Sequence, residues 1–253
     1  MNTTTKKKSG KSSCLKKVES GSLVTQGTSV FDGNTNIIIN KERLDEYLQS
    51  IPQATIGNWS IDQLTATNEG CMIEVVNNQC NGMEHRNSGI KPGDEVLRLM
   101  KGDKCMMSPT VAELSDHFDL FLNHAKGDIL ITGLGLGIIP FLLDSMPDVD
   151  SVTVFESEAD VISLVSDYLI DNTSKVTIVH HNAFLGPRND QVFDYIWHDI
   201  WLDISPDNLP EMKALTERYK THAVAQGCWA QAVCVFMLME EDLLRKRIMV
   251  EVK

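Results

Sequence analysis

The feature that most constrains the fold is a short apolar run that leads into three alternating glycines, Asp128-Ile-Leu-Ile-Thr-Gly-Leu-Gly-Leu-Gly137. A second apolar run follows and ends in a carboxylate, Glu156, nineteen residues after Gly137. This order is typical of the opening βαβ unit of a nucleotide-binding α/β domain, in which the carboxylate accepts both ribose hydroxyls. The pattern predicts a Rossmann-like parallel sheet that binds a nucleoside.

The spacing of the glycines narrows the type of ligand. The dinucleotide fingerprint requires a small residue where this chain has Ile138, because helix and strand pack closely at that point. The sequence also lacks the G-x-x-x-x-G-K-[ST] motif of nucleoside triphosphate sites. A nucleoside cofactor without phosphates remains, and S-adenosylmethionine is the leading candidate. The alternative is a glycine-rich turn that binds no ligand.

Charge is distributed unevenly over the 253 residues, whose formal net charge is −12. Residues 1–22 hold six lysines and one acid and carry +5, which leaves −17 for the remainder. Since an acidic body does not attract phosphate backbones, nucleic acid is disfavoured as a partner. The lysine-rich head is expected to be a solubilising tail.

Cysteine usage and hydropathy indicate the compartment. The six cysteines form no C-x-x-C pair, so we expect neither a zinc site nor a disulfide framework. The basic head lacks the apolar core of a signal peptide, and no apolar run approaches membrane-spanning length. We expect a cytoplasmic protein without a membrane partner, and a homodimer remains open.

Three segments are expected along the chain: a disordered Lys/Ser/Thr-rich tail at 1–35, a small β-rich lid with a linking helix at 36–126, and an S-adenosylmethionine-binding domain at 127–253. The lid should open with an amphipathic helix, because apolar residues recur at i, i+3, i+4 and i+7: Leu44, Tyr47, Leu48 and Ile51. Strands are expected at 61–67 and 72–76, a hairpin at 96–107, and the linking helix from Ser108.

The α/β domain is expected to alternate strands and helices. Strands are predicted at 128–132, 151–156, 175–180 and 192–198, and helices at about 137–146 and 158–170, with a further helix around Met212, Leu215 and Tyr219. The chain after Tyr219 has room for one strand and a helix, so the sheet is expected to be shortened at its C-terminus. Residues 236–239 are expected in the core.

Six candidate cofactor-binding residues follow from this arrangement. Gly133, Gly135 and Gly137 should line the methionine part of the cofactor, because only bare backbone allows such close approach. Glu156 should bind the ribose. Asn182 and Ala183, after the third strand, stand where an amide oxygen can accept a hydrogen bond from an adenine amino group, and a simple turn is the alternative.

Asp199 ends the strand Phe193-Asp-Tyr-Ile-Trp-His-Asp199 at the carboxyl edge of the sheet, where ligands of open α/β sheets bind. It is the candidate catalytic residue, as a base or as the partner of an ammonium group. Of the flanking tryptophans, Trp197 is expected in the core. Adjacent histidines on a strand point to opposite faces, so His180 and His181 do not predict a metal site.

With these motifs in place, the chain resembles the class I S-adenosylmethionine-dependent methyltransferase superfamily, over about residues 93–232. Within it, the chain is similar to the spermidine-synthase-like branch and to methyltransferase-like proteins of phages. The marks are Met106-Met-Ser-Pro-Thr-Val-Ala-Glu113, the glycine run, Glu156, residues 193–199 and Gly227-Cys-Trp229. The resemblance implies that Glu156 binds ribose, Asn182 faces adenine, and Asp199 lies beside the reacting sulfonium.

Two departures from related families limit the substrate class. Polyamine synthases carry a Gly-Gly-Gly-Asp-Gly-Gly turn, and this chain has Gly-Leu-Gly-Leu-Gly. Asp199-Ile-Trp-Leu202 replaces the Asn/Asp-Pro-Pro-Tyr motif of base-amino methylation. We therefore expect an enzyme that methylates a small or peptide-like acceptor. The alternatives are aminopropyl transfer to a polyamine and a non-catalytic protein that has kept the cofactor fold.

Overall fold

The structure is a computed structural model that describes residues 41–70, 90–110, 114, 117, 124–188 and 190–240. Three expectations lie outside these residues: the tail at 1–35, the strand at 72–76, and most of the linking helix after Ser108. None of the helices in the described part of the chain combines the length and apolarity that crossing a bilayer requires.

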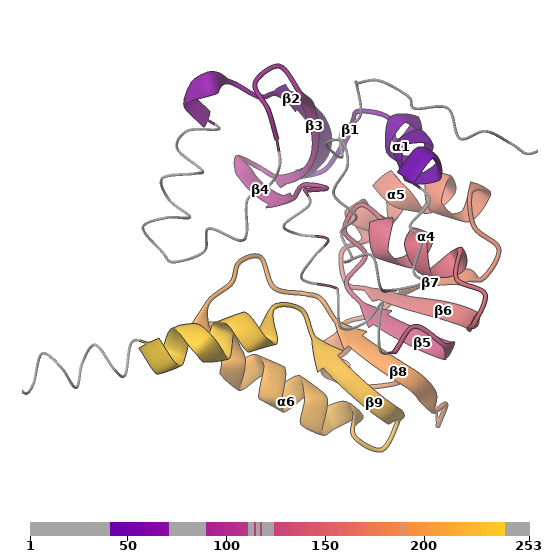
Figure 1. The fold of residues 1–253 in the computed structure, drawn as a ribbon. Helices are drawn as coiled ribbons and strands as arrows, with labels where there is room; N and C mark the ends of the chain where they lie inside the picture. The colour runs from indigo at the N-terminus through magenta and orange to yellow at the C-terminus, as the bar shows by residue number, and fades with distance from the viewer. Residues whose placement is uncertain are drawn as a thin grey trace, which may run out of the picture.

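A five-stranded parallel sheet forms the centre of the molecule (Figure 1). Its strand order is β7-β6-β5-β8-β9, and every neighbouring pair is parallel. Along the chain, the strands are added on one side of β5 as β6 and β7, and then on its other side as β8 and β9. This reversal beside β5 is the topological switch point of a Rossmann-like fold. The predicted fold class is confirmed. The strand bounds are β5 (Gly127–Thr132), β6 (Val149–Glu156), β7 (Val176–His180), β8 (Phe193–His198) and β9 (Ala223–Cys228).

Helices connect these strands and cover the sheet. α4 (Ile138–Asp144) and α5 (Ala159–Asp171) follow β5 and β6, whereas α6 (Leu209–Tyr219) follows β8. Because parallel crossovers are right-handed, connections that run in opposite directions along the sheet lie on opposite faces, as Figure 1 shows for α6 against α4 and α5. Two short 3-10 turns, η3 (Ala183–Leu185) and η4 (Pro206–Asn208), complete the connections.

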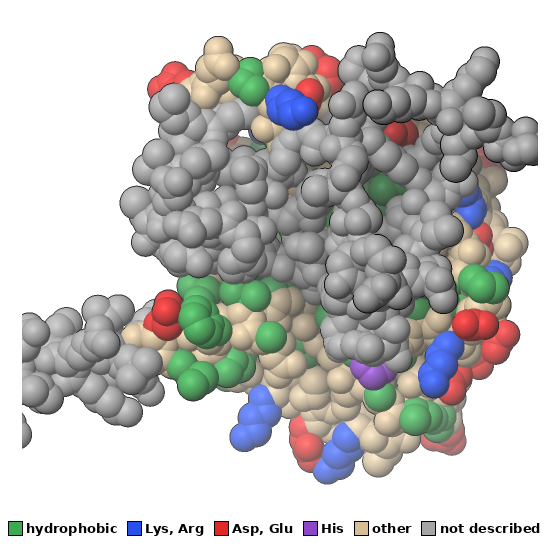
Figure 2. Space-filling view, viewed as in Figure 1, with side chains coloured by type: hydrophobic (Ala, Val, Ile, Leu, Met, Phe, Trp, Pro, Cys, Tyr) green, Lys and Arg blue, Asp and Glu red, His purple; other side chains and the backbone are tan. Residues whose placement is uncertain are grey.

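The C-terminal part has the expected strand and helix. β9 is followed by helical residues 231–240. The expected burial of residues 236–239 is wrong, since Phe236 is 58% exposed and Met239 is 60% exposed. Figure 2 shows apolar side chains gathered over this helix at the left of the view. The helix follows β9, the last strand of the order, and Figure 1 shows it extending away from the sheet at the left of the view.

A second, antiparallel sheet has the order β1-β2-β3-β4. Its strands are β1 (Ala54–Ile56), β2 (Trp59–Thr65), β3 (Glu95–Lys101) and β4 (Lys104–Met107). The predicted hairpin is confirmed, and Gly102 provides the positive φ of 58° that its turn requires. β2 begins two residues earlier than expected, because Trp59 pairs with Lys101 and is buried.

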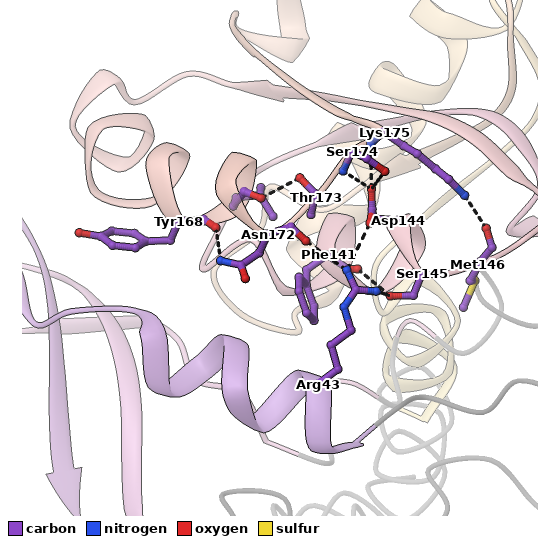
Figure 3. Close-up of polar contacts among 11 residues, drawn as sticks. Arg43, Phe141, Asp144, Ser145, Met146, Tyr168, Asn172, Thr173, Ser174 and Lys175 are labelled. Atoms are coloured by element: carbon purple, nitrogen blue, oxygen red, sulfur yellow. Dashed lines mark hydrogen bonds and ion pairs between the residues drawn. The ribbon is translucent and has the colours of Figure 1, made fainter.

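The helix α1 (Lys41–Ser50) packs on α4 of the α/β unit. Leu44, Tyr47 and Leu48 of α1 are buried, as is Ile51 just after it, as their periodicity predicts. The Tyr47 ring stacks on Phe141 with centroids 4.1 Å apart. The Arg43 guanidinium lies 4.6 Å from the centre of the Phe141 ring, and Figure 3 shows these two residues side by side. Side chains of α1, both sheets and α4 belong to one continuous hydrophobic core. A domain boundary at residue 127 stays a prediction, and this core extends across it.

Candidate functional site

A cavity of about 460 Å³ lies at the carboxyl ends of the parallel strands, between the two sheets. The volume falls within the range of small-molecule sites. The α/β unit contributes the glycine turn after β5, the end of β6 and the segments after β7 and β8, and the antiparallel sheet contributes the opposite wall. Its lining includes Trp59, Lys101, Met107, Gly133, Gly135, Glu156, Glu158, Asn182, Ala183, Asp199 and Trp201.

The first glycine of the turn packs against the chain itself. Gly133 has φ 100°, and a Cβ atom built on it would lie 1.8 Å from the backbone oxygen of Asp199. No side chain can be accommodated there without moving backbone. Gly133 therefore allows β5 and β8 to come together where the cavity begins.

The other two glycines have different neighbours. A Cβ atom on Gly135 would lie 2.5 Å from Met107 Sδ, whereas one on Gly137 would lie 2.6 Å from Tyr47 Oη. Gly133 and Gly135 line the cavity. Gly137, predicted to line the cofactor, lies outside the lining, against α1 and α5.

Glu156 lies at the end of β6 and is 8% exposed. Its Oε2 accepts a hydrogen bond from the Leu134 N–H at 2.9 Å, and its Oε1 accepts one from the Glu158 N–H at 2.8 Å. Ser157 Oγ lies 3.5 Å from Oε1. A carboxylate has about four lone-pair positions, and these three contacts leave one of them, on Oε2, for a further donor. Glu156 lines the cavity from which such a donor would come. Glu156 also links β6 to the glycine turn.

Asn182 and Ala183 lie at the start of η3, after β7, and both line the cavity. The Asn182 side-chain oxygen caps η3 by accepting a hydrogen bond from the Phe184 N–H at 2.9 Å. Its second lone pair is the one that a ligand could use. Ala183 is buried, and its carbonyl oxygen accepts the Tyr219 hydroxyl at 2.9 Å, which fixes the segment onto α6.

Asp199 follows β8, and its side chain is 24% exposed and lines the cavity. Its carboxylate lies 3.8 Å from Nε2 of His117, a buried residue that sequence reasoning did not assign to the site. Burial lowers the pKa of His117 to about 3, so the ring is neutral near pH 7. Its Nδ1 accepts the Trp197 indole N–H at 2.9 Å, which leaves the proton on Nε2, toward Asp199.

The two tryptophans beside Asp199 differ in position. Trp197 is 3% exposed and belongs to the core, as expected. Trp201 lines the cavity, and its indole N–H donates to Glu211 Oε2 at 3.2 Å. That hydrogen bond fixes the ring at the mouth of the site.

Several lining residues were missed by sequence reasoning. Lys101 Nζ lies 2.9 Å from Glu158 Oε1 and 4.8 Å from the centre of the Trp59 ring. Its hydrogen bond holds the pKa of Glu158 below the ordinary value. Glu158 could have been found from its place just after the second strand. Trp59, Lys101 and Met107 come from the antiparallel sheet. No local motif marks Trp59 or Lys101, and Met107 entered only as part of the segment 106–113 that carries the family resemblance.

His181 is a further lining residue, and two contacts hold its ring. His181 Nε2 lies 2.6 Å from the Gly186 carbonyl oxygen, and the ring packs edge-on against Phe155. Within the described ranges, no three His, Cys, Asp or Glu side chains are grouped so as to hold a metal ion.

No family model matches this chain, and no curated protein does. Solved structures with a partly similar fold include an S-adenosylmethionine-dependent methyltransferase from Clostridium acetobutylicum (15% identity, TM-score 0.30, 38% of either chain covered). Others are the fibrillarin pre-rRNA processing protein of Methanococcus jannaschii (18%, 0.35, 53% of this chain and 55% of that one) and phosphoethanolamine N-methyltransferase 1 of Haemonchus contortus (18%, 0.33, 42% and 23%), whose structure contains S-adenosylhomocysteine. This chain thus spans less than two thirds of the length of each of these proteins. Because the similarity is this weak, the argument for the Rossmann-like fold rests on the strand order alone.

Proposed function

We propose that this chain is a methyltransferase-like protein that binds S-adenosylmethionine and methylates a small or peptide-like acceptor. The observation that carries the proposal is Glu156, a buried carboxylate at the end of β6, which pairs with β5 in the parallel sheet. Two backbone N–H groups orient it, Ser157 Oγ makes a longer contact of 3.5 Å, and one lone pair of Oε2 is left for a ligand at the cavity. A carboxylate held at this place in the fold suits a ribose hydroxyl.

The residues around Glu156 fit the rest of the cofactor. Asn182 and Ala183 would hold the adenine, and the backbone of Gly133 and Gly135 would contact the methionine part. Ile138, the first residue of α4, is fully buried against the core, so the start of that helix offers no room for a pyrophosphate. A nucleoside without phosphates therefore suits this cavity better than a dinucleotide.

When bound, S-adenosylmethionine supplies an electrophilic methyl group on a sulfonium. The chain would contribute mainly alignment and exclusion of water. Asp199 would hold a cationic group of the cofactor or acceptor, and Trp201 would cover the reacting atoms. The side chain of Asp199 is 24% exposed and lines the cavity, which favours catalysis over the sealed site expected of a non-catalytic relative.

A second candidate function is aminopropyl transfer to a polyamine, the activity of the spermidine-synthase-like branch. Three carboxylates line the cavity, Glu156, Glu158 and Asp199. Among the described lining residues, Lys101 is the one Lys or Arg, and it pairs with Glu158. A negative cavity suits a polycation, and it equally suits the sulfonium and ammonium groups of S-adenosylmethionine.

Calorimetric titration of the full chain tests the proposal, with S-adenosylmethionine, S-adenosylhomocysteine, methylthioadenosine and NAD as ligands. Glu156→Gln should weaken adenosyl binding about tenfold or more, because it removes a charged acceptor for ribose. Asp150→Asn is the matched control, since Asp150 is exposed at the opposite end of the same strand. A preference for methylthioadenosine would favour aminopropyl transfer. Absence of adenosyl binding, or equal binding of NAD, would refute the proposal.

A further inference from the structure

The third glycine of the turn has an unusual neighbour, the hydroxyl group of Tyr47. Gly137 has φ 73°, and a Cβ atom on it would lie 2.6 Å from Tyr47 Oη. The same atom would lie 3.1 Å from Val165 and 3.2 Å from Leu169. The space that the missing side chain leaves at Gly137 is therefore filled by α1 and α5.

Tyr47 uses this space to reach the glycine turn. Its hydroxyl donates a hydrogen bond to the backbone oxygen of Leu136 at 2.9 Å. Tyr47 is 2% exposed, and burial raises the pKa of its phenol above the ordinary value, so the hydroxyl remains a donor. Leu136 is itself fully buried, and loss of the hydroxyl would leave its carbonyl group without this donor.

Arg43, one turn before Tyr47, fixes α1 in place. Figure 3 shows its guanidinium directed at Asp144, Ser145 and the carbonyl oxygen of Asn172, with the last bond 3.1 Å long. The same group covers the Phe141 ring on which Tyr47 stacks. Arg43 thus fixes α1, and with it Tyr47, to the C-terminal ends of α4 and α5.

Two further backbone groups of the turn are also bonded to side chains. The Leu136 N–H donates to Met107 Sδ at 3.3 Å, and the Leu134 N–H donates to Glu156. Two of these three contacts come from residues that precede the α/β unit. The turn is therefore positioned from both sides, by Tyr47 and Met107 from the N-terminal region and by Glu156 from β6.

We infer that Tyr47 is a positioning residue for the glycine turn, and that Gly137 is a glycine in order to receive the Tyr47 hydroxyl. The inference rests on the proposed function only in assigning ligand binding to this turn. It makes α1 a support of the binding site from outside the cavity, although α1 lies outside the segment that carries the nucleotide-binding motif. Gly133 and Gly135 remain the glycines available to a ligand.

A double-mutant cycle tests the inference with Tyr47→Phe, Gly137→Ala and the double variant, all in the full chain. An alanine methyl group at residue 137 clashes with the Tyr47 hydroxyl, and Tyr47→Phe removes that clash. The factor by which Gly137→Ala raises the unfolding equilibrium constant should therefore be at least fivefold smaller in the Tyr47→Phe background than in wild type. The same comparison with Gly133→Ala should be additive, because that site meets Asp199 instead. Additivity at Gly137 would overturn the inference.

A second readout remains usable if Gly137→Ala does not fold. Hydrogen exchange of the Leu136 and Gly137 amides, resolved by NMR without ligand, should accelerate about tenfold in Tyr47→Phe. Tyr168→Phe, on α5, is the matched control and should not change these rates. Unchanged exchange in Tyr47→Phe would also overturn the inference.

Ligand titration separates this inference from the proposed function. In Tyr47→Phe, adenosyl affinity should fall about fivefold, whereas Tyr168→Phe should bind as the wild type does. If wild type binds no adenosyl ligand, the proposed function fails, yet the exchange rates and the cycle still decide the role of Tyr47. Wild-type affinity in Tyr47→Phe would contradict a role in ligand binding.

Discussion

Asp144 and Glu156 are two buried carboxylates of the same α/β unit, exposed by 9% and 8%, and each accepts hydrogen bonds from two backbone N–H groups. At Asp144 the chain also supplies a cation, because an Arg43 nitrogen lies 3.3 Å from Oδ2. No Lys, Arg or His in the described ranges forms an ion pair with Glu156, which lines the cavity. The protein itself supplies the positive partner of Asp144, whereas Glu156 has acceptor capacity left for a ligand.

The difference shows how similar chemistry serves folding in one place and binding in another. Burial alone would raise the pKa of Asp144, but the N–H groups of Ser174 and Lys175 and the Arg43 guanidinium outweigh it and hold that pKa below its ordinary value. Those contacts join α1, α4 and the segment before β7. Asp144 therefore stabilises the fold, whereas Glu156 orients a turn at the edge of a cavity.

The largest effect should come from removing the enclosed carboxylate. Asp144→Ala leaves the N–H groups of Ser174 and Lys175 without their acceptor and removes the charge partner of Arg43, so we expect a loss of about 4 kcal/mol in the free energy of unfolding. Urea denaturation measures it, with Asp150→Ala as an exposed control that should change stability by less than about 0.5 kcal/mol. A loss below about 1 kcal/mol for Asp144→Ala would contradict the role of Asp144 in stabilising the fold.

As the pH falls, the contribution of His198 to the free energy of unfolding should be lost before that of Asp144. Burial lowers the pKa of His198, which precedes Asp199, from 6.5 to about 4. The stability that comes from keeping this ring neutral is fully present above pH 6.5 and is lost as pH falls toward 4, a change of about 3 kcal/mol. Asp144 also has a lowered pKa, so its contribution is lost only below the ordinary carboxyl range.

Urea denaturation as a function of pH tests this difference. His198→Gln keeps a donor for Gln226 and should remove about 3 kcal/mol of the change between pH 6.5 and 4. His180→Gln, at the exposed end of β7, should leave the profile as it is in wild type. A His198→Gln profile that coincides with the wild type would place the acid sensitivity elsewhere.

The smallest effect should come from the cation nearest the cavity. Lys101 and Glu158 are 41% and 42% exposed, so Lys101→Met should change the free energy of unfolding by less than about 0.5 kcal/mol. The cavity becomes more negative, and a cationic adenosyl ligand should bind about twofold more tightly. Lys220→Met, from the exposed pair with Glu217, is the control for both measurements. Weaker binding in Lys101→Met would mean that Lys101 contacts the ligand.

Much of the α/β unit could be predicted from sequence because its signals are local. Apolar runs, the glycine turn and the helical periodicity of α1 gave the elements with small errors at their ends. The exposure of residues 236–239 could not be predicted, because an apolar helix at the edge of a sheet has the same periodicity as one in the core. The contribution of the antiparallel sheet to the cavity depends on how two sheets pack, which no local pattern encodes.

The sequence by itself determined that a strand enters a glycine turn, that a helix follows, and that Glu156 ends the next strand. These are properties of backbone conformation and side-chain periodicity within some thirty residues. Only the tertiary structure decided what each glycine accommodates: the carbonyl of Asp199, the thioether of Met107 and the hydroxyl of Tyr47. Tyr47 and Leu136 are 89 residues apart in the chain, and they meet because α1 packs on α4. A missing side chain shows where space is needed, and the packing of distant elements decides what fills it.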